Sequence, residues 1–193
     1  METMRKRYTG LFLTLVLILG TLAGCGSDPV DTEEDKQLEH PAKLYFVSSE
    51  YLETGDETIE PMVIVETTVT LPVEEADDIY ETTLDLLVQV PEEGTDTMLR
   101  EAMVEDVTVT DSIAVVDFNG ELMHGGSMEE VYLIEQVVRT LVKSFDDFSA
   151  VKFTVDGMGV DSLMGHLEAN CTYGLITVEE DGNDVELVTI MEE

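Results

Sequence analysis

The sequence predicts an α+β fold in which two helices lie on one face of a mostly antiparallel sheet, with a β-hairpin added at the C-terminus. Short apolar runs rich in β-branched residues predict the strands. Two segments in which apolar residues recur at helical spacing predict the helices. An Asp-Gly turn between two apolar runs near the C-terminus predicts the hairpin. Hydrophobic residues make up 44% of the 193 residues, which suffices for one domain with a single core.

Two strands and a helix are expected first. The strands are Lys43–Ser48, which is short and aromatic, and Met62–Leu71, which is rich in β-branched residues. The segment 54–60 between them is expected to be an exposed loop. The first helix is expected over Glu74–Val90, because its apolar residues recur at helical spacing and its acidic residues lie at the positive N-terminal end. Pro91 ends it.

A second hairpin and a second helix follow. The arms Val107–Val109 and Ile113–Phe118 flank a short turn, and the second arm is apolar enough for a central strand. The next helix begins at Ser127, which is expected to form a capping box with Glu130. Its apolar stripe consists of Ile134, Val137, Val138, Leu141, Val142 and Phe145.

The remaining elements are strands. Val151–Val155 is expected to be one, closed by a turn at Asp156 and Gly157. The tail Tyr173–Met191 is expected to form the C-terminal hairpin, with its turn at Asp181–Asp184. The complete order is therefore β, β, α, β, β, α, β, followed by the hairpin.

The first 24 residues have the pattern of an export signal. Three basic residues, Arg5 to Arg7, precede the apolar run Leu11–Leu19, and small residues follow. The apolar run is too short to cross a bilayer, which takes about 20 apolar residues.

The tetrapeptide Leu22–Cys25 resembles the lipobox of bacterial lipoproteins. The resemblance implies cleavage between Gly24 and Cys25 and acylation of the Cys25 thiol with chains such as palmitate. One acyl chain binds a membrane only marginally, whereas two give a stable anchor. The alternative is an ordinary secretory signal.

Composition divides the rest of the chain into three parts. Residues 25–42 are acidic, contain two prolines, and are expected to form a flexible tether. Residues 43–170 are expected to form the domain, and residues 171–193 a hairpin extension packed on it. Cys171 has no cysteine partner once Cys25 is acylated, so it is expected to be a small apolar core residue.

The charge of the chain excludes nucleic acid as a partner. The net charge is −34, and the part after residue 24 carries −36, because residues 1–24 contribute three basic residues and one acidic residue. Such a surface repels phosphate backbones. Solubility is the simpler explanation of the acidity. Calcium binding is the alternative, although residues 181–184 lack the spacing of an EF-hand.

No catalytic or metal-binding pattern emerges, and we expect no enzyme activity and no cofactor. His124, Gly125 and Gly126 are similar to an esterase oxyanion loop, but the sequence has no G-x-S-x-G motif. The two glycines are better explained as a sharp turn into the following helix. His40 and His166 have no second ligand at zinc-binding spacing. A carboxylate pair acting as a hydrolase remains open, because acidic residues are numerous.

The block from Lys43 to Leu167 resembles the GerMN domain, a sporulation and spore germination module of bacterial lipoproteins. The matching segments are KLYFVSSEYL, LDLLVQVP, IAVVDFNGELMHGGS, EEVYLIEQVVRTLVKSF, VKFTVDG and GHL. They span about two-thirds of the chain. This resemblance implies an extracytoplasmic, non-enzymatic domain with a β-α-β-β-α-β core similar to the ring-building motifs of secretion systems. The chain departs from the tandem protein GerM by having one copy and an extra C-terminal hairpin.

Two functions follow as expectations. The first is a lipoprotein on the extracytoplasmic face of the cell membrane that takes part in envelope complexes of sporulation or germination. Its partners would be the membrane, through the acyl chains on Cys25, and other envelope proteins or further copies of itself. The second is a cell-surface lipoprotein that binds a small ligand or calcium and has a general envelope role.

Overall fold

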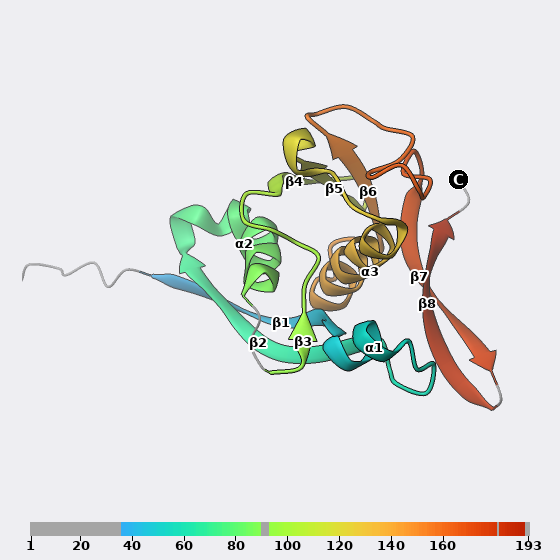
Figure 1. Ribbon diagram of the computed structural model, residues 1–193. Helices are drawn as coiled ribbons and strands as arrows, with labels where there is room; N and C mark the ends of the chain where they lie inside the picture. Colours follow the sequence, from blue (N-terminus) through green and yellow to red (C-terminus); the bar gives the residue numbers. More distant parts are fainter. Residues whose placement is uncertain (1–35, 90–92, 181, 192–193) are drawn as a thin grey trace, which may run out of the picture. The chain divides into compact units, whose positions relative to one another are not determined.

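The computed structural model describes residues 36–89, 93–180 and 182–191. The predicted α+β class is confirmed, and the strands divide between two sheets where the sequence predicted one (Figure 1). One sheet has the order β2-β1-β3 and the other the order β4-β5-β6-β7-β8. The first contains β1 (Gln37–Ser48), β2 (Met62–Pro72) and β3 (Thr95–Asp96). The second contains β4 (Val104–Thr110), β5 (Ile113–Phe118), β6 (Ala150–Val155), β7 (Thr172–Glu180) and β8 (Asn183–Met191).

Strand β1 begins earlier than predicted. It starts at Gln37 instead of Lys43, so residues 37–42 belong to the sheet and not to a tether. It pairs with β2 in antiparallel register from Gln37 opposite Pro72 to Val47 opposite Met62. The polar composition of residues 37–42 concealed a period-2 pattern in which alternate residues are covered, ending at the buried Ala42.

His40 is therefore part of the fold and not of a tether. Its ring stacks on Phe145 with the ring centroids 4.4 Å apart, and its Nε2 atom lies 2.7 Å from the Ser144 carbonyl oxygen. Both contacts join β1 to the end of the second predicted helix, more than 100 residues later in the sequence.

The first predicted helix is present but interrupted. Helix α2 (Ile79–Asp85) is preceded by a 3₁₀ turn at Val73–Asp78 and followed by another at Leu86–Val88. Glu75 leaves the helical region, with φ −104°. The first turn carries four carboxylates, and their mutual repulsion disfavours a regular helix there. The apolar positions still reach the core, because Ile79, Leu84 and Leu87 are buried.

A short helix that the sequence did not predict follows β1. Helix α1 (Ser49–Thr54) has the Ser48 hydroxyl as its N-cap, which accepts a hydrogen bond from the Tyr51 N–H. It ends at Gly55, whose φ of 62° is the left-handed conformation that glycine adopts without strain.

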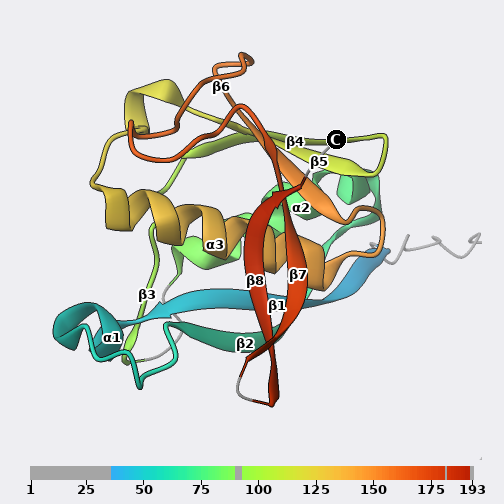
Figure 2. The same ribbon diagram turned by 90° about the vertical axis from the view of Figure 1, so that its right-hand side faces the viewer.

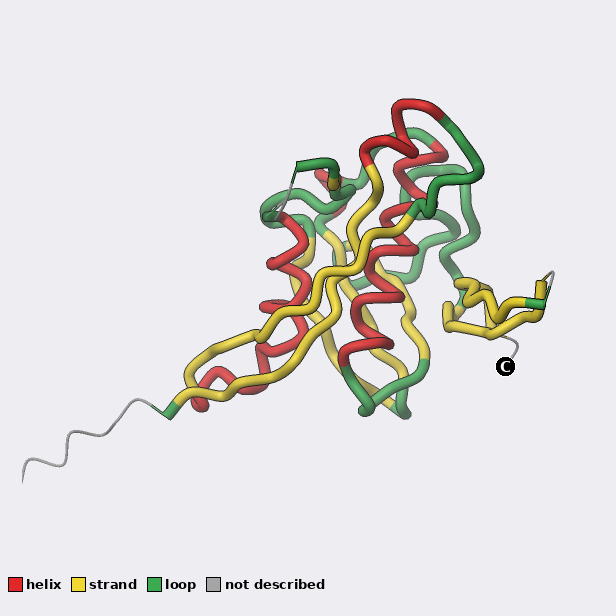
Figure 3. Tube along the Cα trace, turned by 90° about the horizontal axis from the view of Figure 1, so that it is seen from below, coloured by secondary structure: helices red, strands yellow, loops and turns green. Residues whose placement is uncertain are grey.

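Helix α3 (Ser127–Ser144) lies between the two sheets. It packs against β1 of the first sheet and against β6, β7 and β8 of the second. Figures 1 and 2 show it crossing the centre of the unit. Figure 3, seen from below, shows the long β1–β2 pair in front of α2 and α3. Contact on both sides explains its broad buried surface, which includes Leu133, Ile134, Val137, Val138 and Leu141.

Polar side chains of α3 complete the open edge of β1. The Thr140 hydroxyl accepts a hydrogen bond from the Tyr45 N–H at 3.1 Å, and the Gln136 amide donates to the Tyr45 carbonyl at 3.0 Å. The Ser144 hydroxyl accepts from the Lys43 N–H at 2.9 Å. Strand β3 pairs only with the last two residues of β1, so the helix takes the place of a strand along this edge.

The predicted hairpins are confirmed in the second sheet. Strands β4 and β5 are antiparallel, and β5 pairs in parallel with β6 through the α3 connection. The predicted turn after β6 is present, and φ is positive there at Asp156 (50°) and Gly157 (73°). Strands β7 and β8 pair from Thr172 opposite Met191 to Glu180 opposite Asn183. The hairpin joins the domain by pairing of β7 with β6.

The start of α3 differs from the predicted capping box. Gly126 is the N-cap, and its N–H donates to the Glu129 carboxylate at 2.7 Å, so the acidic partner is Glu129 and not Glu130. Glu130 turns inward and is fully buried. The glycines 125 and 126 form the turn into this helix, as expected. Position 125 requires glycine because a Cβ atom there would lie 2.8 Å from the Met164 sulfur.

Candidate functional site

A groove lies between helix α3, the first sheet and strand β8. It encloses about 550 Å³. The first sheet contributes Tyr45, Met62 and Ile64, and the loop before β2 contributes Glu60 and Pro61. Helix α3 contributes Val131, Tyr132, Glu135 and Arg139, and β8 contributes Asp184, Val185, Glu186 and Leu187. The hairpin therefore forms one wall, and residues of the predicted domain form the others.

The groove exposes apolar side chains from three elements. Ile64 is 53% exposed, Val131 is 36% exposed and Leu187 is 42% exposed. Three further apolar residues on the hairpin, Ile176, Ile190 and Met191, are also exposed, outside the residues that line the groove. Scattered exposed apolar residues are common, but a concentration around one groove is typical of interaction sites.

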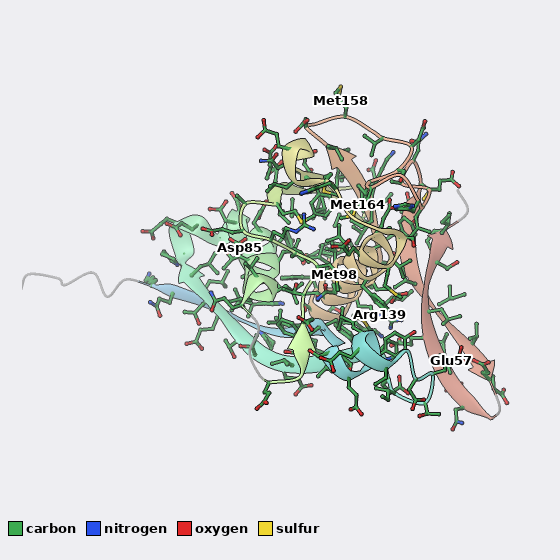
Figure 4. All side chains as sticks on the ribbon, viewed as in Figure 1. Glu57, Asp85, Met98, Arg139, Met158 and Met164 are labelled. Carbon is green, nitrogen blue, oxygen red and sulfur yellow. The ribbon has the colours of Figure 1, made fainter. Side chains whose placement is uncertain are left out.

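Ion pairs fix the hairpin against α3. Arg139 contacts the Glu135 carboxylate at 2.5 Å and donates from Nη2 to the Glu186 carbonyl at 2.9 Å. Lys143 pairs with the Glu186 carboxylate. Figure 4 labels Arg139 on α3 next to the hairpin. These contacts hold one wall of the groove in place through a charge-assisted network.

Tyr45 lies beneath this network. Burial raises the pKa of its phenol, the neighbouring Lys143 and Arg139 act in the opposite direction, and Glu186 adds to the increase. The phenol therefore stays neutral and contributes packing. Around it, the groove contains four carboxylates, those of Glu60, Glu135, Asp184 and Glu186, against the single guanidinium of Arg139.

Strand β8 is the outer strand of the second sheet among the described residues. Natural proteins usually protect such an edge with lysine, proline or a covering segment. The side chains of β8 include neither lysine nor proline, and two of its apolar residues, Leu187 and Ile190, are more than 40% exposed. Arg139 covers this edge at the Glu186 carbonyl, but the edge has neither lysine nor proline of its own against pairing with another strand.

The lipid-attachment residue Cys25 and its predicted cleavage partner Gly24 lie outside the described residues. Within residues 36–89, 93–180 and 182–191, no helix is both long and apolar enough to cross a bilayer. The position of an anchor therefore stays a prediction from the sequence.

Two of the three histidines, His124 and His166, lie beside the same turn. The His124 Nδ1 atom lies 3.2 Å from Arg100 Nη1, and the His166 Nε2 atom lies 3.4 Å from the Gly125 carbonyl oxygen, so both border the turn before α3. In the part of the chain that the structure describes, no three His, Cys, Asp or Glu side chains are placed to hold a metal ion. These histidines hold a turn in place.

Cys171 is half-buried, and its thiol lies 3.5 Å from the Glu168 carbonyl oxygen. Burial raises the pKa of this thiol. It therefore stays protonated at neutral pH, which suits the small apolar role expected of it.

The groove could not be located from the sequence. The one available signal was the presence of apolar residues at exposed positions of strands, namely Ile64 in β2 and Leu187 in β8. Which strands meet at the groove depends on the crossing of the hairpin over α3, which no local pattern encodes.

The chain is similar to several solved structures. One is a candidate lipoprotein from Clostridium perfringens, with 18% identity over 70% of this chain and 87% of that chain and a TM-score of 0.44. The second is the first GerMN domain of the sporulation protein GerM from Bacillus subtilis, with 20% identity over 67% of this chain and 92% of that chain and a TM-score of 0.49. The third is the tandem GerMN domains of the same protein, with 15% identity over 78% of this chain and 60% of that chain and a TM-score of 0.49. No curated protein matches the chain.

The family model described as "Germane: Sporulation and spore germination" matches residues 43–161, which is more than half of the chain. It covers the elements from within β1 to the turn after β6 and stops before the C-terminal hairpin. The resemblance found in the sequence is therefore confirmed, and this chain belongs to the Germane family of sporulation and spore germination.

Proposed function

We propose that this protein is a lipid-anchored component of envelope complexes in sporulation or spore germination, and that it acts by binding other proteins instead of by catalysis. The observation that carries the proposal is the groove beside β8, where Ile64, Val131 and Leu187 are exposed between two sheet edges. Membership of the Germane family supports the physiological setting. The export signal and the LAGC sequence support the extracytoplasmic membrane location.

The anchor would position the groove at the membrane surface. Cleavage after Gly24 would make Cys25 the first residue, and two or more acyl chains on it would hold the chain stably. The strong negative charge disfavours direct contact with anionic headgroups, so the acyl chains would be the only membrane contact.

The proposal is tested by isolating the tagged, full-length protein from cross-linked cells of the source bacterium, during growth and during starvation. Labelling with a palmitate analogue shows whether Cys25 is acylated, and a Cys25→Ser variant is the control. We expect label and membrane fractionation only in the natural chain, and envelope partners that appear in starved cells.

Two results would contradict the proposal. Equal labelling of the Cys25→Ser variant would exclude the anchor. Isolation of a monomer alone under both conditions, with the label present, would exclude a role in complexes.

A further inference from the structure

We infer that the groove binds an extended segment of a partner protein, with alternating apolar and basic side chains, by adding it as a strand to the outer edge of β8. This inference rests on the proposed function and names the chemistry of the partner. It combines the direction of the backbone groups of β8, the apolar walls and the sign of the charge.

The backbone of β8 offers its outer hydrogen-bonding groups to the groove. The Glu186 carbonyl accepts from Arg139, so it points away from β7, and one of its two acceptor positions is already used. Because alternate residues of a strand direct their backbone groups to the same side, those of Asp184, Val188 and Ile190 also point away from β7. Strand addition at such an edge uses these groups, and pockets for alternate side chains supply the specificity.

The walls of the groove suit the apolar half of such a segment. A strand added to β8 would lie over Val131 of α3 and beside Ile64 of β2, both of which line the groove with Leu187. Every second side chain of the added strand would then be covered by these residues. This would remove from water the apolar surface that the structure leaves exposed.

The charges suit the basic half. Glu60, Glu135, Asp184 and Glu186 line the groove. Glu135 is paired with Arg139 and Glu186 with Lys143, which leaves Glu60 and Asp184 without a cation among the described residues. Lysine or arginine at alternate positions of the added strand would meet this excess of carboxylates.

The same charges disfavour a second copy of this chain as the occupant. Each copy carries a net charge of −34, and an edge pair between two copies would bring the acidic residues Asp184 and Glu186 of both together. Like charges directly opposite each other destabilise strand pairing. The structure therefore favours a basic partner over self-association.

The test titrates the full chain in detergent against a fluorescent ten-residue peptide of alternating lysine and valine. The matched probe has glutamate in place of each lysine. We expect the lysine peptide to bind at least about tenfold more tightly, with an affinity that falls as salt is added.

Two variants separate the groove from general charge attraction. Leu187→Lys places a cation in the groove, whereas Met158→Lys makes the same charge change at a residue that is 66% exposed on the loop after β6, far from β8 (Figure 4). We expect about tenfold weaker binding for Leu187→Lys and less than about twofold for Met158→Lys. Ile190→Pro, which removes one outward N–H of an edge strand, should also weaken binding. Equal losses in the two lysine variants would overturn the inference.

A photo-reactive residue at position 187 then tests the site in cells, with position 158 as the control. We expect adducts at 187 whose partner peptide alternates basic and apolar residues. Adducts only with a second copy of this chain would overturn the inference. The absence of adducts at 187, with envelope partners still isolated through the anchored chain, would overturn this site while leaving the proposed function standing.

Discussion

The carboxylate of Glu130 holds the loop that follows β6. Its Oε1 atom accepts hydrogen bonds from the Ser162 hydroxyl and from the N–H groups of Leu163 and Met164, at 2.8 to 2.9 Å. Its Oε2 atom accepts from the N–H groups of His166 and Leu167 at 2.8 and 3.1 Å. Burial alone would raise the pKa of Glu130, but these hydrogen bonds outweigh burial and hold the pKa below its usual value.

Replacing this carboxylate with an amide should destabilise the protein. In Glu130→Gln the side-chain NH₂ group faces N–H donors and cannot accept from them. We expect a loss of about 2 to 4 kcal/mol in the free energy of unfolding, measured by urea denaturation at pH 7. The half-exposed neighbour Glu129 is the control, because Glu129→Gln keeps an acceptor for the Gly126 N–H and loses only a partly exposed ion pair with Arg100. Similar losses in both variants would contradict this role.

The pH dependence of the Glu130 effect has a definite sign. The pKa of Glu130 is lower in the folded protein than its ordinary value of 4.5, so its stabilisation is complete above that value. It is lost as the pH falls below 4.5 and through the lowered pKa. The difference in unfolding free energy between the natural chain and Glu130→Gln should therefore shrink in acid.

Glu81 should show the opposite pH dependence. Its Oε1 atom accepts from the Val107 N–H at 2.5 Å, and its Oε2 atom is buried with no hydrogen-bond partner among the described residues. Burial raises the pKa of Glu81, and the nearby carboxylates of Asp106 and Asp78 add to the increase. Ionising this group in the folded protein therefore costs stability as the pH rises above its ordinary value of 4.5.

The variant Glu81→Gln removes that cost. Its unfolding free energy relative to the natural chain should improve between pH 4.5 and pH 7, because the fold disfavours ionisation of the natural carboxyl above its ordinary pKa of 4.5 and glutamine does not ionise. Urea denaturation at the two pH values measures the change. A difference that does not vary with pH would show that Glu81 is ionised at no cost.

At the scale of elements, α3 takes the place of a strand. Its Thr140 and Gln136 side chains are completely buried and satisfy both backbone groups of Tyr45, which no strand reaches among the described residues. Gln136 also accepts from the Met98 N–H at 2.7 Å, which ties a third segment to the helix. Buried polar residues on this helix face are therefore required by the neighbouring strand edge.

Removing one of these side-chain contacts should open the edge locally. Thr140→Val keeps the shape of the side chain but leaves the Tyr45 N–H without an acceptor, at a cost of about 1 to 3 kcal/mol. Hydrogen exchange should become faster at the Tyr45 amide and stay slow at the Phe46 amide, because Phe46 directs its N–H toward β2. Equal acceleration at both amides would indicate general loosening of β1.

At the scale of the whole molecule, charge repulsion opposes folding. A net charge of −34 concentrates like charges when the chain becomes compact, and salt screens them. The melting temperature should therefore rise between low salt and 0.5 M sodium chloride.

The nature of the added cation separates screening from specific binding. At matched ionic strength, calcium chloride should raise the melting temperature no more than magnesium chloride does if the acidity serves only solubility. A larger increase with calcium at millimolar concentration would reveal a calcium site through linkage and would support the ligand-binding alternative.

The elements were predictable wherever local signals were strong. The hairpins β4–β5 and β7–β8 and the apolar stripe of α3 follow from residue periodicity and turn chemistry, and the structure contains all of them. The early start of β1 was missed because its covered positions include a histidine, and the break at Glu75 was missed because helical spacing continued through it. In β1, contacts with distant residues outweighed the local pattern, whereas near Glu75 repulsion among neighbouring carboxylates opposed it.

The sequence by itself determined the α+β class, the family and the acidic character, and it predicts lipid attachment at Cys25. Each of these depends only on periodicity, composition or a short motif. Only the tertiary structure decided that the strands form two sheets, that Glu130 supports a loop, and that β8 forms a groove with α3 and β2. These features depend on which distant segments meet, and local chemistry does not encode that.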